Sequence, residues 1–166
     1  MSSLDDDDSA PEQGLQRVAV RRAVTETLAV LRMASAQWAN HGCPGTAECC
    51  QLSTTKREPW LWPSEWQALL ELLEREHRPL PAPRADGGCP FLDPTGLRCT
   101  VYAARPFGCR TFFCHRITGP AKQPVEGTHA LLERLTSINV ALDAQSQPRS
   151  MLQWFSKADH HGGTGP

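Results

Sequence analysis

Apolar residues recur with a helical period in three stretches of the chain. Within residues 15–40, after Ser64 and from about Thr128 to Gln145, they return every three to four positions, the spacing that places side chains on one face of an α-helix. The three stripes consist of Val20, Val24, Leu28, Leu31 and Trp38; of Trp66, Leu69, Leu70, Leu73 and His77; and of Leu131, Leu135, Ile138 and Leu142. The pattern therefore predicts three helices. A last short turn over residues 151–155 is expected to dock on them.

Boundary signals support the second of these helices. Pro63 precedes Ser64, and Gln67 follows the serine by three positions, which is a capping-box pattern with Ser64 as the N-cap. A proline-rich stretch over residues 79–83 ends the helix and forms an extended linker. His77, on the apolar stripe, is expected to lie in the core.

Residues 84–122 differ from the helical stretches. They contain four cysteines, turn-forming glycines and prolines, and one short strand-like run at residues 99–102. Such a segment buries too little apolar area to order itself, so something else must hold it in place. The predicted fold class is mainly α, a small helical frame of about three helices around an irregular, loop-rich cysteine and metal module.

The ends of the chain differ from its middle in composition. Residues 1–12 contain five acids and no base, and residues 158–166 are rich in histidine and glycine. Both are predicted to be disordered, the first as an acidic arm. Residues 13–157 are predicted to form a single cysteine-cluster domain, because 166 residues suit one domain with a modest core.

The charge balance limits the classes of partner. Beyond the acidic arm, the chain contains 17 basic and 13 acidic residues. This surplus of positive charge is too small for a dedicated nucleic-acid binder. The sequence contains no apolar run long enough to span a bilayer and no secretory signal pattern at its start. We therefore expect a cytoplasmic protein with no membrane partner.

Seven cysteines form two groups in the sequence: Cys43, Cys49 and Cys50, then Cys89, Cys99, Cys109 and Cys114. In a reducing compartment, clustered cysteines are more typical of metal ligands or redox thiols than of disulfides. Small buried side chains are the structural alternative. The grouping favours metal binding, with all seven cysteines as candidate ligands.

The spacing is unlike that of an ordinary zinc finger. The second group reads Cys-x9-Cys-x9-Cys-x4-Cys, whereas finger ligands come in pairs separated by about two to four residues. Neighbouring side chains diverge, so Cys49 and Cys50 are not expected to bind one ion together. One of them is expected to reach a second centre or to face inward.

Basic residues accompany the second group. Residues 84–122 contain six bases and two acids, and Arg98 and Arg110 each adjoin a cysteine. A nearby cation favours the thiolate form that binds metals. The alternative is that these arginines form an ordinary solvated face.

Four sequence blocks in this region resemble the YkgJ-type cysteine-cluster family, which is described as a zinc- or iron-chelating domain. They are Cys89-Pro90-Phe91-Leu92-Asp93, Arg98-Cys99-Thr100-Val101-Tyr102, Arg105-Pro106 and Cys109-Arg110-Thr111-Phe112. The resemblance covers roughly residues 41–116. It implies that the cysteines hold a metal.

The first cysteine group departs from the family pattern. That pattern, Cys-x3-Cys-x2-Cys-Cys, would place its earlier cysteines at Gly42 and Thr46, whereas this chain has only Cys43. Seven thiols cannot complete two four-cysteine sites. Either His41 or His115 supplies an eighth ligand, or one centre keeps an open position.

Thiolate ligands suit iron–sulfur clusters and zinc rather than calcium or magnesium. The wide spacers favour iron or an iron–sulfur cluster, with zinc a close second. Three functions remain open: a metal-binding protein, a small enzyme or enzyme accessory with a cluster like that of the flagellin lysine methylases, and a thiol redox protein. No catalytic residue and no protein partner is indicated. The cluster Trp60, Trp62 and Trp66 is expected to pack in the core, and Tyr102 near Cys99.

Overall fold

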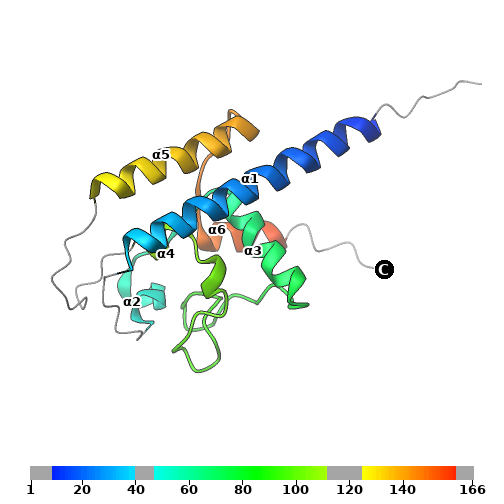
Figure 1. Cartoon of the computed structure of the whole chain (residues 1–166). Helices are drawn as coiled ribbons and strands as arrows, with labels where there is room; N and C mark the ends of the chain where they lie inside the picture. Colours follow the sequence, from blue (N-terminus) through cyan, green and yellow to red (C-terminus); the bar gives the residue numbers. More distant parts are fainter. Residues whose placement is uncertain (1–8, 40–46, 112–124, 160–166) are drawn as a thin grey trace, which may run out of the picture.

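The computed structural model describes residues 9–39, 47–111 and 125–159. They form a mainly helical fold, as predicted (Figure 1). The described residues contain six α-helices rather than about three, because short helices accompany the long ones. Their bounds are α1 Ser9–Gln37, α2 Leu52–Thr55, α3 Pro63–Arg75, α4 Phe107–Arg110, α5 Val125–Leu142 and α6 Met151–Asp159. Two 3₁₀ helices, η1 Glu48–Cys50 and η2 Tyr102–Ala104, and two short strands, β1 Trp60–Leu61 and β2 Arg149–Ser150, complete the elements.

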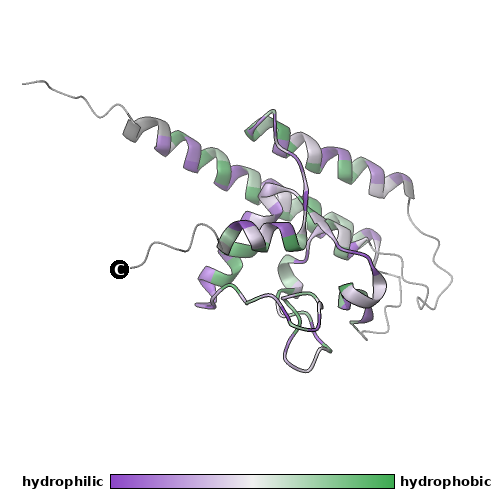
Figure 2. Ribbon diagram, turned by 180° about the vertical axis from the view of Figure 1, so that it is seen from behind, coloured by the Kyte–Doolittle hydropathy of each residue, from purple (hydrophilic) through white to green (hydrophobic). Residues whose placement is uncertain are grey.

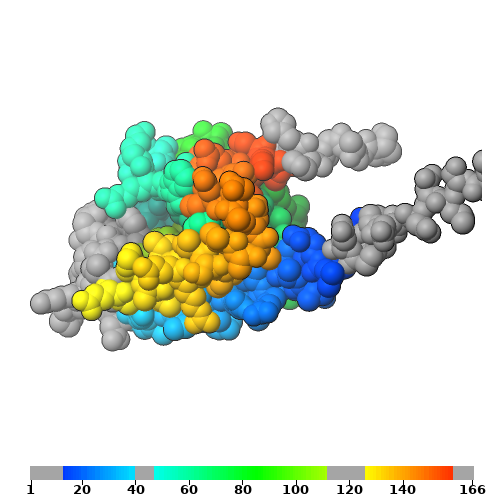
Figure 3. Space-filling model, turned by 90° about the horizontal axis from the view of Figure 1, so that it is seen from above, coloured from blue at the N-terminus to red at the C-terminus, as the bar shows by residue number. Residues whose placement is uncertain are grey.

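Helices α1 and α5 run antiparallel, side by side, along one side of the molecule (Figures 1 and 3). Their facing apolar residues form one core, into which Phe107 of α4 also packs. Helix α1 begins at Ser9 instead of near Leu15, so it includes residues 9–12, which the sequence analysis assigns to the acidic arm. Residues 1–8 of the arm and 160–166 of the tail lie outside the described residues.

A second core joins α3 and α6 to the cysteine-bearing loops. Trp66 of α3 stacks on Trp154 of α6 at a ring-centroid distance of 5.7 Å. Phe155 of α6 contacts both Trp66 and Phe91, each with ring centroids 5.2 Å apart. Because Phe91 lies two residues beyond Cys89, this aromatic cluster fixes the loop that carries that cysteine.

A small antiparallel sheet, absent from the sequence prediction, brings α6 to this core. Trp60 pairs with Ser150 and Leu61 with Arg149. The Trp154 indole Nε1 donates to the carbonyl of Leu61 at 3.1 Å. Pairing between segments about 90 residues apart depends on the tertiary fold, and two-residue strands leave no alternating pattern in the sequence.

The start of α3 differs from the prediction. Trp62, not Ser64, is the N-cap residue. Its backbone N–H donates to the Glu65 carboxylate at 2.8 Å, so Glu65 does the capping. Ser64 is buried and accepts a hydrogen bond from the Thr27 hydroxyl at 2.7 Å. His77 is exposed, with a left-handed φ of 53°, because it follows the helix end.

The strand-like run at residues 99–102 does not form a strand, so this prediction is wrong. Only one isolated bridge forms, between Leu92 and Cys99. Both the backbone N–H and the hydroxyl of Thr100 donate to the Phe91 carbonyl, at 2.8 Å and 2.9 Å. The chain then turns into η2, so the pairing does not continue.

The long helices carry both hydrophobic and hydrophilic residues, and none of them is hydrophobic along its whole length (Figure 2). Apolar and polar positions interleave along both α1 and α5. In the part of the chain that the structure describes, no helix combines the length and the apolar character of a bilayer span.

Candidate metal centre

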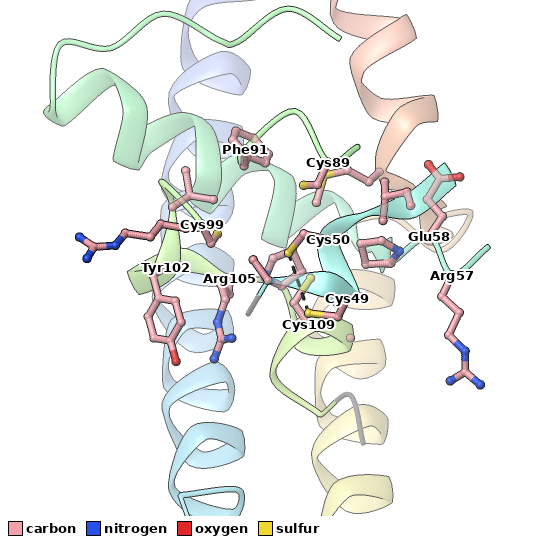
Figure 4. A pocket seen from close by; sticks show the side chains of 18 of the residues that line it. Cys49, Cys50, Arg57, Glu58, Cys89, Phe91, Cys99, Tyr102, Arg105 and Cys109 are labelled. Atoms are coloured by element: carbon pink, nitrogen blue, oxygen red, sulfur yellow. Dashed lines mark hydrogen bonds between the residues drawn. The ribbon is translucent and has the colours of Figure 1, made fainter. Parts of the chain in front are cut away.

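Cys49 and Cys50 lie on η1. Ala47, with a left-handed φ of 53°, begins this turn, and the Cys50 N–H donates to the Ala47 carbonyl at 2.9 Å. The two sulfurs are 3.9 Å apart and line the same cavity (Figure 4). The sequence analysis expects the two side chains to diverge. A 3₁₀ turn, with three residues per turn, rotates successive side chains by less than the half-turn of a strand, so both reach one space.

Backbone hydrogen bonds bring Cys89 to this pair. The Cys89 N–H donates to the Cys50 carbonyl at 2.8 Å. A second bond joins the same two segments: the Ser53 N–H donates to the carbonyl of Gly87, whose φ is +67°. These two bonds join sequence segments about 40 residues apart, so they hold the two cysteine groups together.

Arg84 fixes the loop that follows. Its guanidinium pairs with Asp86 at 2.7 Å and donates to the Asp93 carbonyl at 3.0 Å. Asp93 in turn accepts from the backbone N–H groups of Leu97 and Arg98. Cys99 follows directly, at the bridge with Leu92.

Cys109 lies on α4, which is docked on the helical frame. The Phe107 N–H donates to the buried Glu65 carboxylate at 2.6 Å. The guanidinium of Arg110 donates to the carbonyls of Arg105 and Ala103 and to the Ser35 hydroxyl. The bond to Ser35 reaches α1 and the bond to Glu65 reaches α3, so α4 is held by two helices of the frame.

All five described cysteines line one cavity of about 540 Å³ (Figure 4). They are free thiols: Cys49, Cys50, Cys89, Cys99 and Cys109. Among the described residues, however, no three His, Cys, Asp or Glu side chains are close enough to hold a metal ion together. Cys43 and Cys114, and both His41 and His115, lie outside the described residues.

The thiols differ in the direction in which their surroundings shift the pKa. The hydrogen bond with Cys50 lowers the pKa of Cys49 to about 6, and the Arg105 cation acts in the same direction. The same bond, with burial, raises the pKa of Cys50. Burial raises the pKa of Cys89 to about 11, and it also raises the pKa values of Cys99 and Cys109. Because metals bind thiolates, metal uptake would release protons from these buried thiols.

Two arginines act on the thiols. Arg110, as expected from the sequence, acts to lower the pKa of Cys99, which burial raises, and Arg105, which was not expected to do so, acts in the same direction on both Cys49 and Cys99. Arg110 is held by backbone carbonyls, and Arg98 is exposed at the cavity rim. Arg105 lines the cavity, with its guanidinium carbon 3.8 Å from the ring centroid of Tyr102. Tyr102 is itself exposed instead of being packed beside Cys99.

The tryptophan cluster is only partly in the core. Trp66 is buried and Trp62 is partly buried, as expected. Trp60 is exposed and lines the cavity. Its neighbour Leu61 points the opposite way and is buried, which is the alternation of a strand.

Glu65 is the other functional residue that the sequence analysis missed. Proline at the first helical position and an acid at the third form a recognisable helix start over Trp62-Pro63-Ser64-Glu65. That signal identifies the cap, but not the second hydrogen bond to Phe107, which depends on the tertiary fold.

Comparison with known protein families matches residues 40–129, more than half of the chain, to the CxxCxxCC family, described as "Putative zinc- or iron-chelating domain". The chain belongs to this family. The match spans the cavity-lining cysteines and the segments that position them. Comparisons with curated proteins and with solved structures gave no match. A zinc or iron ion is thus the ligand class of the CxxCxxCC family, and the soft thiols of the cavity suit both metals.

Proposed function

We propose that this chain binds iron, as an ion or an iron–sulfur cluster, through thiolates of the cavity, with zinc as the second choice. The described ligands are Cys49, Cys50, Cys89, Cys99 and Cys109. Cys43 and Cys114 are proposed as further ligands, and the protein is proposed to work in the cytoplasm, where its thiols stay reduced.

The gathering of five thiols around one cavity carries this proposal. They come from η1, from the loop over residues 84–101 and from α4, which are separate segments of the chain. Apolar packing accounts for part of this arrangement, since Cys89 lies in a core, but it does not require cysteine at all five cavity-lining positions. The 3.9 Å between the sulfurs of Cys49 and Cys50 is also close to the separation of about 3.8 Å that two thiolates have on one tetrahedral zinc.

The loop-rich part of the site is proposed to depend on the metal for its final geometry. Residues 76–101 contain turns and one isolated bridge, without a regular helix. Because no three of the described thiols are in position for one ion, we propose that binding draws the cysteine segments together. The free energy of metal binding then contributes directly to the stability of this module.

The test is a cysteine substitution in protein purified without oxygen. We expect Cys109→Ser to lose most of the bound metal, because a hydroxyl is a poor ligand for soft metals. Met151→Leu, which removes a thioether from the same cavity wall, should keep it. Metal content, acid-labile sulfide and visible absorption are measured. Iron with sulfide would establish a cluster, and colourless protein with zinc the second choice. Folded wild-type protein that takes up neither metal would refute the proposal.

A thiol redox function is the second candidate, and one observation favours it. Cys49 and Cys50 are in contact and the pKa of Cys49 is lowered to about 6, which makes its thiolate abundant at neutral pH. If this is the function, metal-free protein treated with a disulfide oxidant will lose two thiols, while Cys50→Ser will lose none at this pair. Retention of both thiols in the wild type would exclude it.

A further inference from the structure

The cavity is larger than a metal centre requires. Its volume of about 540 Å³ lies within the range of about 300–1,000 Å³ that is typical of small-molecule sites. The thiols occupy one part of its wall. Most of the remaining wall is apolar and includes Phe91, Val101 and Met151, which are buried.

Three large, exposed apolar side chains line the cavity. Trp60, Leu97 and Tyr102 are 58%, 60% and 62% exposed, and all three line this one cavity. They come from β1, the loop before Cys99 and η2. Exposed apolar groups that line one cavity are typical of a binding site rather than of ordinary surface.

The charged groups of this cavity are mainly cationic. Among the described residues, Arg57, Arg98 and Arg105 line it, against the carboxylate of Glu58 and the thiol of Cys49, whose pKa is lowered. That carboxylate already accepts a hydrogen bond from the Leu152 backbone N–H. The site therefore favours an anionic group on its occupant.

Arg105 provides a specific anchor. Its guanidinium lies against the face of Tyr102, and in Figure 4 the two side chains run side by side. Its Nε is buried and has no hydrogen-bond acceptor among the described residues. By contrast, Arg84 and Arg110 donate to carbonyls and carboxylates of the chain itself. The guanidinium of Arg105 is thus not engaged by an acceptor of the described residues, and a carboxylate is the ligand group that matches its donors.

We infer that the cavity beside the cysteines binds a small organic carboxylate with an apolar body. The carboxylate accepts hydrogen bonds from the Arg105 guanidinium, whose planar fork matches two carboxylate oxygens. The apolar body covers Tyr102, Leu97 and Trp60. This goes beyond the proposed metal function and does not rest on it, because neither Arg105 nor these apolar residues are metal ligands.

The experiment compares two probes that differ only in charge. Phenylbutyrate and its neutral amide, phenylbutyramide, are titrated into the full chain, in metal-loaded and metal-free form, and binding is followed by NMR. In the wild type we expect the carboxylate to bind at least about tenfold more tightly than the amide. Arg105→Gln should abolish this preference, and Arg105→Lys should restore part of it. Arg32→Gln, on the exposed side of α1 and outside the cavity lining, is the control and should retain it.

A further variant tests the apolar contact. Trp60→Ala should weaken both probes by a similar factor and leave the preference for the carboxylate unchanged. Thermal unfolding of every variant checks that it is folded, and metal content is measured in parallel. Equal binding of the two probes, no binding of either, or a preference that survives in folded Arg105→Gln would overturn the inference. If Arg105→Gln instead weakens only metal binding, Arg105 serves the thiolates, and the inference is again overturned while the metal function stands.

Discussion

Glu65 is the residue that joins the cysteine-bearing helix α4 to the frame. Its buried carboxylate accepts from the backbone N–H groups of Trp62 and Phe107, at 2.8 Å and 2.6 Å. Burial raises its pKa from 4.5 to about 7, although both hydrogen bonds and Arg110 act in the opposite direction. One side chain thus caps α3 and positions α4, two residues before Cys109.

This pKa predicts a pH dependence of stability. Between pH 4.5 and about 7, the folded chain holds a proton on Glu65 that the unfolded chain releases. The stabilisation that this proton provides is fully present below the lower value and is lost as the pH rises through the higher one. We expect the free energy of unfolding of the wild type, relative to Glu65→Gln, to fall by up to about 3 kcal/mol across this window. Denaturant titrations over the range measure it, and parallel curves for the two proteins would contradict it.

At the scale of the element, the turn at Gly87 sets the contact between the two cysteine groups. The φ of +67° is readily available only to glycine. A Cβ at this position would lie 3.0 Å from the Cβ of Ser53, whose backbone N–H bonds to the Gly87 carbonyl. The turn therefore needs glycine for both its conformation and its close approach to α2.

Gly87→Ala should destabilise the protein by about 1–2 kcal/mol. It should also weaken metal binding, because Cys89 would move away from Cys50. Gly14→Ala is the control, since Gly14 lies within α1 and a Cβ there meets nothing within 4 Å; we expect it to be neutral or slightly stabilising. Thermal unfolding and competition with a chelator measure the two effects. A stable Gly87→Ala with unchanged metal affinity would show that the turn is not needed.

At the scale of the whole molecule, two separate apolar cores stabilise the fold. One lies between α1 and α5, and the other joins α3, α6 and the cysteine loops. Among the described residues, the first core contains no cysteine, whereas Cys89 is part of the second and both Cys50 and Cys99 pack against it. The proposed metal binding should therefore be coupled mainly to the second core.

Metal removal should loosen the two cores unequally. On adding a chelator to loaded protein, we expect hydrogen exchange to accelerate first at the backbone N–H groups of Cys89 and Thr100, whose bonds hold the cysteine loops. Amides within the α1 and α5 core should change little, and the midpoint of thermal unfolding should fall. Uniform acceleration over the whole chain would mean that the metal stabilises one cooperative unit instead.

The sequence alone predicts much of the helical frame. Periodic apolar residues identify α1, α3 and α5, because a helix places residues three and four apart on one face and that regularity is local. The chemistry of the proposed site is also visible in the sequence, since seven grouped thiols restrict the metals that suit it. Helix ends are predicted less well, as Ser9 and Trp62 illustrate, because capping depends on individual hydrogen bonds.

The tertiary structure alone decides which residues meet. It brings η1, the loop of Cys89 and Cys99, and α4 around one cavity, and it places Arg105, rather than Arg98 or Arg110, with a buried donor that has no acceptor among the described residues. Both outcomes depend on contacts between segments tens of residues apart. No local periodicity records such contacts, because the free energy that selects them comes from burial and hydrogen bonding in the assembled fold.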